Sequence, residues 1–257
     1  MIRRSDIVQW SVAHPWQNED QVEQDLLLSR AMIEIANDPL LGEELVLRGG
    51  TAFHKLFLPE PYRYSEDLDF VRTTGGGIGD VMKRLTALGQ ELGFDVRTKM
   101  GMYPKVMWRF AFADGVPGKI KLEINTFERS PMMELTAHAH SVENGFYTGR
   151  ALIPTFQPEE LVATKLRALY QRKKGRDLYD LWLALTVLEL DPEKIVAAFP
   201  AYRPEGVTGE DVLANLRLKL QDPEFRNDVC AMIKVGAPAY DPDAAGELVA
   251  NELLAKI

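Results

Sequence analysis

The most constraining feature of this sequence is a turn of small residues that precedes, by one short helix and a loop, two aspartates with one residue between them. Residues 44–47 predict a short buried strand, and Gly49 and Gly50 permit a tight turn directly after it. We expect Thr51 to cap the following helix, whose free amide groups favour a phosphate anion. The helix ends before Pro59. This order predicts a phosphate-holding turn a short distance upstream of the aspartates.

The two aspartates, Asp67 and Asp69, lie in a segment that reads as a strand. Because side chains alternate between the two faces of a strand, both carboxylates point the same way while Leu68 and Phe70 point into a core. Carboxylates about 6–7 Å apart along a strand repel each other unless a cation lies between them, and Mg²⁺ prefers carboxylates together with phosphate oxygens. A Gly-Gly pair alone is an ordinary turn, and a D-x-D alone is often solvated surface. Together, in this order, they predict metal-assisted transfer of a nucleotide from a nucleoside triphosphate.

Composition restricts the class of protein. With 257 residues, of which 46% are hydrophobic, the chain can bury a sizeable core. Its one cysteine, Cys230, excludes an intramolecular disulfide and fits a reducing cytosol. No apolar run approaches membrane-spanning length, so we expect a soluble cytoplasmic protein without a membrane partner. The net charge of −8 argues against a general nucleic-acid coating protein. Residues 161–176, which hold several basic residues and no acidic one, still predict a local basic groove.

The pattern of elements predicts an α+β fold in which a mixed sheet flanked by helices precedes a helical C-terminal part. We place a mixed core domain at residues 1–155 and a helical domain at residues 156–257, the latter contributing a lysine and an aspartate to the site. Periodicity and turn signals predict the following elements: helices over 5–14, 19–37 and 79–92; strands over 94–100, 105–112 and 119–127; and, after helical pattern from about residue 157, helices over 178–188, 192–199, 209–220, 222–234 and 242–256.

Other charged residues are candidates for the same site, each with a plainer alternative. On the strand over 119–127, Glu123 shares the polar face and is a third candidate carboxylate, or an ordinary polar residue of an edge strand. Lys165 lies in an otherwise apolar helical stretch, where it reaches a phosphate or extends its charge to solvent along an apolar stem. Asp177 follows a predicted helix break at Gly175 and is either part of the site or, with Asp180, a stabiliser of the helix start.

At this point the sequence resembles the AbiEii/AbiGii group of nucleotidyltransferase toxins, including the MenT type, within the DNA polymerase β-like nucleotidyltransferase superfamily. Four motifs carry the resemblance in the family's order, and together they span roughly residues 45–185. They are residues 49–51 with 65–69, residues 119–123, residues 161–165 and residues 176–181. Gly50 stands where many relatives have serine and Arg176 where many have lysine, and the loop between Gly50 and Asp67 is longer than usual. The C-terminal helices match no named motif.

The resemblance implies a role for each matching residue. A metal ion, Mg²⁺ or Mn²⁺, is expected on Asp67, Asp69 and the second-motif Glu123. Ser65 corresponds to the family's active-site hydroxyl, Lys165 to the lysine that contacts the triphosphate, and Asp177 to an essential aspartate that activates the acceptor. These residues form the expected catalytic set: Ser65, Asp67, Asp69, Lys165 and Asp177. The expected nucleotide-binding set is Gly49, Gly50, Thr51, Arg63, Ser65 and Lys165. The expected acceptor-binding set is Arg167, Arg172, Lys173, Lys174 and Arg176.

The function that the resemblance implies is that of the toxin in a toxin–antitoxin pair. Such an enzyme moves NMP from an NTP to an acceptor, which for the MenT type is the 3′ end of tRNA, so that aminoacylation and translation stop. The cognate antitoxin is expected to be encoded nearby. Two alternatives stay open at this level: the acceptor is a hydroxyl of a protein, either the antitoxin or the enzyme itself, or the fold is a nucleotide-binding regulatory module without turnover.

Overall fold

The computed structural model describes residues 2–257 and contains one seven-stranded sheet with the strand order β3-β4-β5-β2-β1-β7-β6. The β2–β5 and β1–β7 pairs are parallel and the other pairs are antiparallel, so the sheet is mixed. The expected α+β class is therefore confirmed. The strands are β1 Leu45–Arg48, β2 Asp67–Arg72, β3 Asp95–Lys99, β4 Lys105–Ala111, β5 Pro117–Asn125, β6 Thr136–Glu143 and β7 Thr148–Thr155.

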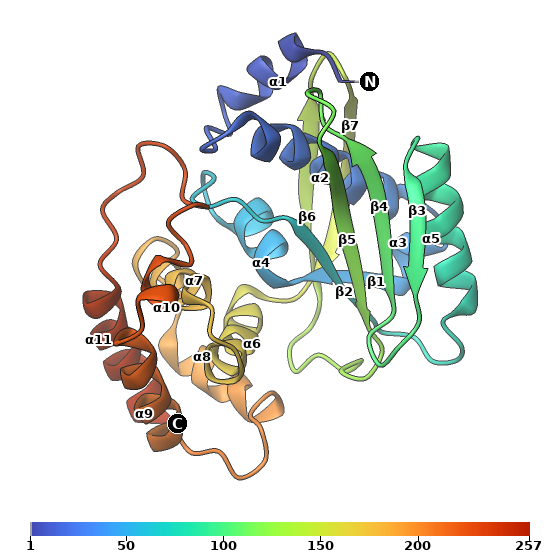
Figure 1. Cartoon of the computed structure of the whole chain (residues 1–257). Coiled ribbons are helices and arrows are strands. Elements are labelled where there is room, and N and C mark those ends of the chain that lie inside the picture. Colours follow the sequence, from blue (N-terminus) through green and yellow to red (C-terminus); the bar gives the residue numbers. More distant parts are fainter. Residues whose placement is uncertain (1) are drawn as a thin grey trace.

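Helices flank the sheet and then form a separate group at its side (Figure 1). The N-terminal helices are α1 Arg4–Ser11, α2 Glu19–Asn37, α3 Leu41–Glu44, α4 Gly49–Ala52, which continues as a π-helical turn Phe53–Phe57, and α5 Gly79–Glu91. The C-terminal helices are α6 Pro158–Gln171, α7 Gly175–Thr186, α8 Pro192–Ala198, α9 Gly209–Leu220, α10 Pro223–Asn227 and α11 Pro242–Glu252, with short 3-10 turns at Phe199–Ala201 and Leu254–Lys256.

Two apolar cores correspond to these two groups. In the first, the long helix α2 packs on the sheet, where alternation buries one face of β5 through Ile120, Leu122 and Ile124. The second core is formed by α6 to α11 and also takes in Phe53 and Leu58 from the segment around α4. The α4 segment thus lies between the sheet and the C-terminal helices (Figure 1). The division into domains at residues 155 and 156 stays a prediction.

Two helix starts differ from expectation. Thr51 is not an N-cap, because α4 already begins at Gly49 and its N-cap is Arg48. Asp177 is not an N-cap either, because α7 begins at Gly175 with Lys174 as its N-cap. In both cases a tertiary contact takes the polar side chain that would otherwise cap the helix: Thr51 bonds to the loop before β2, and Asp177 forms ion pairs.

Sequence reasoning missed the β6–β7 hairpin and overextended one helix. β6 has the sequence TAHAHSVE, which is poor in the branched and aromatic residues that favour strands. It forms because its whole length pairs with β7, from Thr136 opposite Thr155 to Glu143 opposite Thr148. The helix expected over 222–234 is only α10, Pro223–Asn227. No helix among residues 2–257 combines the length and apolar character needed to cross a membrane.

Candidate active site

The Gly-Gly turn lies directly against the aspartate strand. Gly49 has φ +78°, a conformation that favours glycine, and a Cβ there would lie 2.6 Å from Oδ2 of Asp69. A Cβ on Gly50 would lie 2.6 Å from Nη2 of Arg63 and 3.3 Å from Oγ of Ser65. The two glycines are therefore required for close approach, and they let the start of α4, β2 and the loop before β2 meet at one point.

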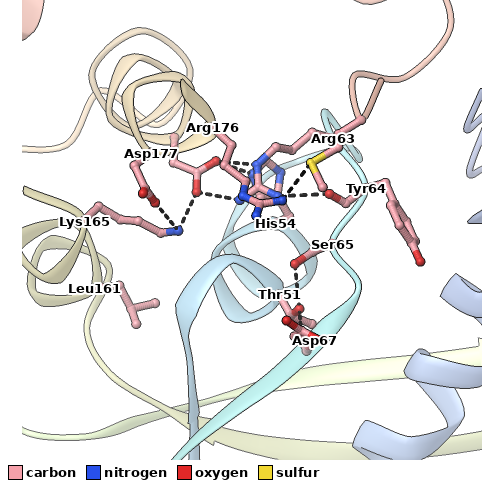
Figure 2. A network of polar contacts seen from close by, with 12 residues as sticks. Thr51, His54, Arg63, Tyr64, Ser65, Asp67, Leu161, Lys165, Arg176 and Asp177 are labelled. Atoms are coloured by element: carbon pink, nitrogen blue, oxygen red, sulfur yellow. Dashed lines mark hydrogen bonds and ion pairs between the residues drawn. The ribbon is translucent and has the colours of Figure 1, made fainter. Parts of the chain in front are cut away.

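A short hydrogen-bonded link fixes the loop before β2. Oγ1 of Thr51 contacts Oγ of Ser65 at 2.9 Å and bonds to the carbonyl oxygen of Asp67 (Figure 2). Because Thr51 belongs to α4, these contacts hold Ser65 and the first aspartate of the strand at a fixed distance from the glycine turn. Sequence reasoning placed Thr51 in the nucleotide-binding set, and the structure gives it this positioning contact.

Strand pairing decides what lies beside each aspartate. The parallel β2–β5 register places Asp67 opposite Lys121 and Asp69 opposite Glu123. Nζ of Lys121 lies 2.8 Å from Oδ2 of Asp67, and Nζ of Lys105, from β4, lies 2.7 Å from Oε2 of Glu123. A lysine therefore occupies the position of a counter-ion at each of these carboxylates.

Of the two aspartates on β2, Asp69 is the one without such a counter-ion among residues 2–257. Its side chain makes no hydrogen bond or ion pair within residues 2–257. Burial, reinforced by the charge of Asp67, raises the pKa of Asp69. The pKa of Asp67 is also raised by burial, with Lys121 opposing the shift. A divalent cation between the two carboxylates would relieve this repulsion, so the pair fits the donor set of such an ion.

The third expected metal ligand is not gathered into a cluster with the other two. Across the described chain, no group of three or more His, Cys, Asp or Glu side chains has a geometry that could hold a metal ion. Glu123 is the neighbour of Asp69 in register, but its carboxylate is paired with Lys105. The role of Glu123 as a ligand stays a prediction.

A buried ionic network lies on the other side of the glycine turn, centred on Asp180 of α7. Its carboxylate accepts two hydrogen bonds from Arg63, both 2.7 Å long, and one of 2.8 Å from Nε2 of His54. Nζ of Lys165 lies 2.8 Å away. Asp180 is fully buried, and the other three residues are at most 6% exposed. Burial alone would raise the pKa of Asp180, but the charges of Arg63 and Lys165 outweigh it and hold that pKa well below its usual value.

The same network extends to the second expected aspartate. Asp177 lies 3.3 Å from Nζ of Lys165 and accepts two hydrogen bonds from Arg172, of 2.6 and 2.8 Å. Burial opposes ionisation, yet Lys165 and Arg172 lower the pKa of Asp177. Figure 2 shows Lys165 and Asp177 on the C-terminal helices, Ser65 and Asp67 on the opposite side, and Arg63 with His54 between them.

An open cleft runs between the two charged groups, with carboxylates on its sheet side and cations on its helix side. Two adjoining hollows form it, and the larger has a volume of about 350 Å³. The smaller is lined by Ser65, Asp67, Asp69, Lys165 and Arg176 among others. Both hollows are lined by Gly50, Asp69, Lys165 and Arg172.

Most of the expected acceptor-binding cations are compensated by acids from elsewhere in the chain. Arg172 is held by Asp177, as described above, and Arg167 pairs with Glu128. Burial alone would raise the pKa of Glu128, but hydrogen bonds from Arg167 and Arg48 lower it to about 2. The remaining pairs are Lys173 with Asp222 and Glu224, Lys174 with Asp228, and Arg176 with Asp228. The stretch therefore carries less free positive charge than its sequence suggests.

Comparison with known proteins identifies the family. The family model described as nucleotidyl transferase AbiEii toxin, Type IV TA system, matches residues 30–251. The chain belongs to the AbiEii family. It is a nucleotidyltransferase toxin, and the resemblance stated from its motifs is confirmed.

One solved structure shows the same fold, and a second gives a weaker superposition. MenT4, a nucleotidyltransferase toxin from Mycobacterium tuberculosis H37Rv, superposes with a TM-score of 0.69 at 17% identity over 100% of this chain and 91% of that one. An antigenic nucleotidyltransferase-like protein from Paracoccidioides brasiliensis aligns with a TM-score of 0.42 at 16% identity over 86% and 96% of the two chains. No curated protein matches this AbiEii toxin in sequence.

Sequence reasoning missed the central position of Asp180 and the part played by His54. Asp180 was interpreted only as a stabiliser of a helix start, and His54 was not considered. One signal was available: Asp177 and Asp180 are three residues apart, so they share a face of α7. His54 lies one turn beyond Gly50, but nothing in the sequence shows that it meets α7.

Replacing the central carboxylate tests the network. Asp180→Asn leaves Arg63 and Lys165 buried without a full counter-charge, so we expect the free energy of unfolding to fall by about 3–5 kcal/mol. The matched control is Asp243→Asn, which removes an exposed pair with Arg226 and should cost about 1 kcal/mol or less. Urea unfolding followed by circular dichroism measures both variants. Equal losses would contradict the central role of Asp180.

The acid stability of the protein should depend on His54. Burial, reinforced by the charge of Arg63, lowers the pKa of His54 to about 4, from 6.5 in an unfolded chain. Between these two pH values the unfolded chain binds a proton that the folded chain does not. The free energy of unfolding therefore falls as pH drops below 6.5, by up to about 3 kcal/mol for this group. Urea unfolding between pH 7 and pH 5.5 should show a shallower slope for His54→Asn. An unchanged slope would show that His54 does not titrate in this way.

Proposed function

We propose that this AbiEii toxin transfers NMP from an NTP to the 3′ end of tRNA with a divalent metal ion, Mg²⁺ or Mn²⁺, bound at Asp67 and Asp69, and thereby blocks aminoacylation. As a member of a toxin–antitoxin family, it has an NTP substrate and an antitoxin partner. The observation that carries the proposal is the cleft itself, in which Asp69, a carboxylate without an ion-pair partner among residues 2–257, faces two positioned cations, Lys165 and Arg172.

The sheet side of the cleft would hold the metal and the reacting phosphate. When bound, the ion would neutralise phosphate charge and bring the acceptor hydroxyl close to the α-phosphate. The contribution of the chain is the rigid placement of Asp67 and Asp69 on β2, with Glu123 as the proposed third ligand on β5. Lys121 holds Asp67 in place from the neighbouring strand, and Thr51 holds Ser65 beside it.

The helix side would bind the β- and γ-phosphates. Lys165 is fixed between Asp177 and Asp180 and lines the cleft, so its ammonium group is positioned before substrate arrives. Arg172 lines the same cleft while Asp177 holds its guanidinium. Gly49 and Gly50 line the cleft beside these cations. Arg63 also lines the cleft, although Asp180 takes its Nε and one donor of its Nη2.

The role of Asp177 follows from its contacts. Its carboxylate is fully buried beneath Lys165 and Arg172. In this position Asp177 orients both cations toward the phosphates, and its low pKa makes it a poor proton acceptor. The geometry thus supports a positioning role, in place of the activation of the acceptor that the family resemblance implies.

The acceptor is the second half of the proposal. The MenT-type resemblance favours tRNA, whose backbone would be guided by the basic residues bordering the cleft, Arg167, Arg172, Lys173, Lys174 and Arg176. One observation also favours a protein hydroxyl, on the antitoxin or on the toxin itself. The basic residues are ion-paired, which reduces their attraction for a polyanion.

Replacing Asp69 should reduce the rate of the reaction more than it reduces the stability of the protein. Asp69→Asn removes a partly buried charge that has no ion-pair or hydrogen-bond partner among residues 2–257, so we expect the thermal midpoint to stay or rise while pyrophosphate release falls by about 100-fold or more. EDTA should reduce pyrophosphate release by the wild type as much as the substitution does. Adding Mg²⁺ or Mn²⁺ should restore that activity. Exposed Asp95 supplies a control, since Asp95→Asn should change neither property. A fully active Asp69→Asn enzyme would refute the site assignment.

Labelling identifies the acceptor. The purified toxin is incubated with each of four α-labelled NTPs and either deacylated total tRNA or cell lysate freed of RNA. We expect label at the 3′ end of tRNA and loss of aminoacylation, with Asp69→Asn as the inactive control. Label confined to protein would overturn the tRNA acceptor and leave the nucleotidyltransferase assignment intact.

A further inference from the structure

A second cavity lies behind the loop that carries Arg63 and Ser65, and the expected functions of the site do not account for it. Its volume is about 230 Å³, and its lining comes from the loop between α1 and α2, from α2, from the turn after α4 and from β6. Arg63 and Ser65 line both this cavity and the cleft. The two spaces are thus neighbours that share a wall.

Several buried polar atoms of this cavity have no hydrogen-bond partner among residues 2–257. They are Nε1 of Trp16, Nδ1 of His54 and Nε2 of His140. Trp16 is 7% exposed and His54 is 5% exposed, so water at the surface does not satisfy them. Orphaned groups of this kind carry a free-energy cost in a folded protein unless a ligand or ordered water bonds to them.

The hydrogen-bonding character of two imidazoles is fixed by their other contacts. Nε2 of His54 must carry its hydrogen, because it bonds to the carboxylate of Asp180, and burial keeps the ring neutral at pH 7. Nδ1 of His54 is therefore an acceptor. Nδ1 of His14 likewise donates to the carbonyl oxygen of Trp10, at 3.2 Å, so Nε2 of His14 is an acceptor. Trp16 can only donate.

The charges around the cavity are already balanced. Lys55 pairs with Asp25 at 2.7 Å, Glu60 pairs with Lys234 at 2.7 Å, and Arg63 is held by Asp180. Within residues 2–257, the cavity lining has no free cation for a phosphate, and the histidines form no metal-binding cluster. A neutral ligand with both N–H donors and an acceptor fits this lining, and the ring of Trp16 with Leu58 and two prolines gives it apolar walls.

Size indicates how much of a ligand enters. Sites for whole drug-sized ligands have volumes of about 300–1,000 Å³, so this cavity accommodates one flat ring system and not a complete nucleotide. The rest of such a ligand must extend past Ser65 into the cleft. We propose that the cavity binds the base of the NTP substrate, with preference for a base that carries an exocyclic amino group, while the triphosphate lies in the cleft. This inference rests on the proposed function.

Nε1–H of Trp16 and Nε2 of His140, neither of which has a partner among residues 2–257, provide the test. Dissociation constants are measured by calorimetry for the α,β-methylene analogues of four NTPs and, as a ligand without a base, for tripolyphosphate, all with Mg²⁺. Trp16→Phe keeps the apolar ring and removes Nε1–H, so we expect about threefold to tenfold weaker binding of the preferred nucleotide. His140→Phe should reduce the difference between amino-bearing bases and uracil. Tripolyphosphate should bind both variants as it binds the wild type, and Trp182→Phe, remote from the cavity, is the matched control.

The outcomes separate this inference from the proposed function. Unchanged nucleotide affinity in both folded variants would show that the cavity holds water only. A raised KM for the RNA acceptor with unchanged nucleotide affinity would assign the cavity to an acceptor base. Wild-type affinity for tripolyphosphate equal to that for every nucleotide would also overturn base binding, and each of these results leaves the proposed transfer intact. A wild type that binds neither nucleotide nor tripolyphosphate would overturn both.

Discussion

The buried carboxylate of Asp180 is the constraint on which the rest of this structure depends. It accepts hydrogen bonds from Arg63 and His54 and lies 2.8 Å from the ammonium group of Lys165. Taking such charges out of water is costly unless each is paired and hydrogen-bonded, so the four side chains have one well-satisfied arrangement. Because they come from the helix after the glycine turn, the loop before β2, α6 and α7, that arrangement fixes the C-terminal helices against the sheet and defines the width of the cleft.

The charged side chains on the two sides of the cleft differ in how fully they are ion-paired. On the helix side, Lys165 and Arg172 each have an acidic partner within the protein. On the sheet side, Asp67 has Lys121 but Asp69 has no partner among the described residues, and its raised pKa reflects that cost. Local rules of good packing are commonly broken at functional sites. The unsatisfied carboxylate, in a cleft with preformed cations, is where a metal-bound phosphate would complete the charge balance.

The loop that carries Arg63 and Ser65 separates two spaces of opposite character. The cleft on one side is charged, whereas the cavity on the other is lined by neutral imidazoles, an indole and balanced ion pairs. A nucleoside triphosphate has the same division between a charged end and a flat, neutral end. The loop is held from several directions, by Thr51 at Ser65, by Asp180 at Arg63 and by Met232 at the backbone of Tyr64. Both spaces therefore keep their shape without a ligand.

The sequence by itself determined the mixed sheet with its helical C-terminal part, most helix positions, the glycine turn and the shared face of Asp67 and Asp69. These features depend on periodicity and on residues close together in the chain. Such local patterns are present in the sequence before the chain folds. Only the tertiary structure decided that Lys121 lies beside Asp67, that distant acids neutralise the basic stretch, and that Arg63 meets Asp180. It also decided the β6–β7 hairpin, which strand pairing creates despite weak propensity. Ion pairs and strand partners depend on distances between residues far apart in sequence, and those distances exist only after the chain has folded.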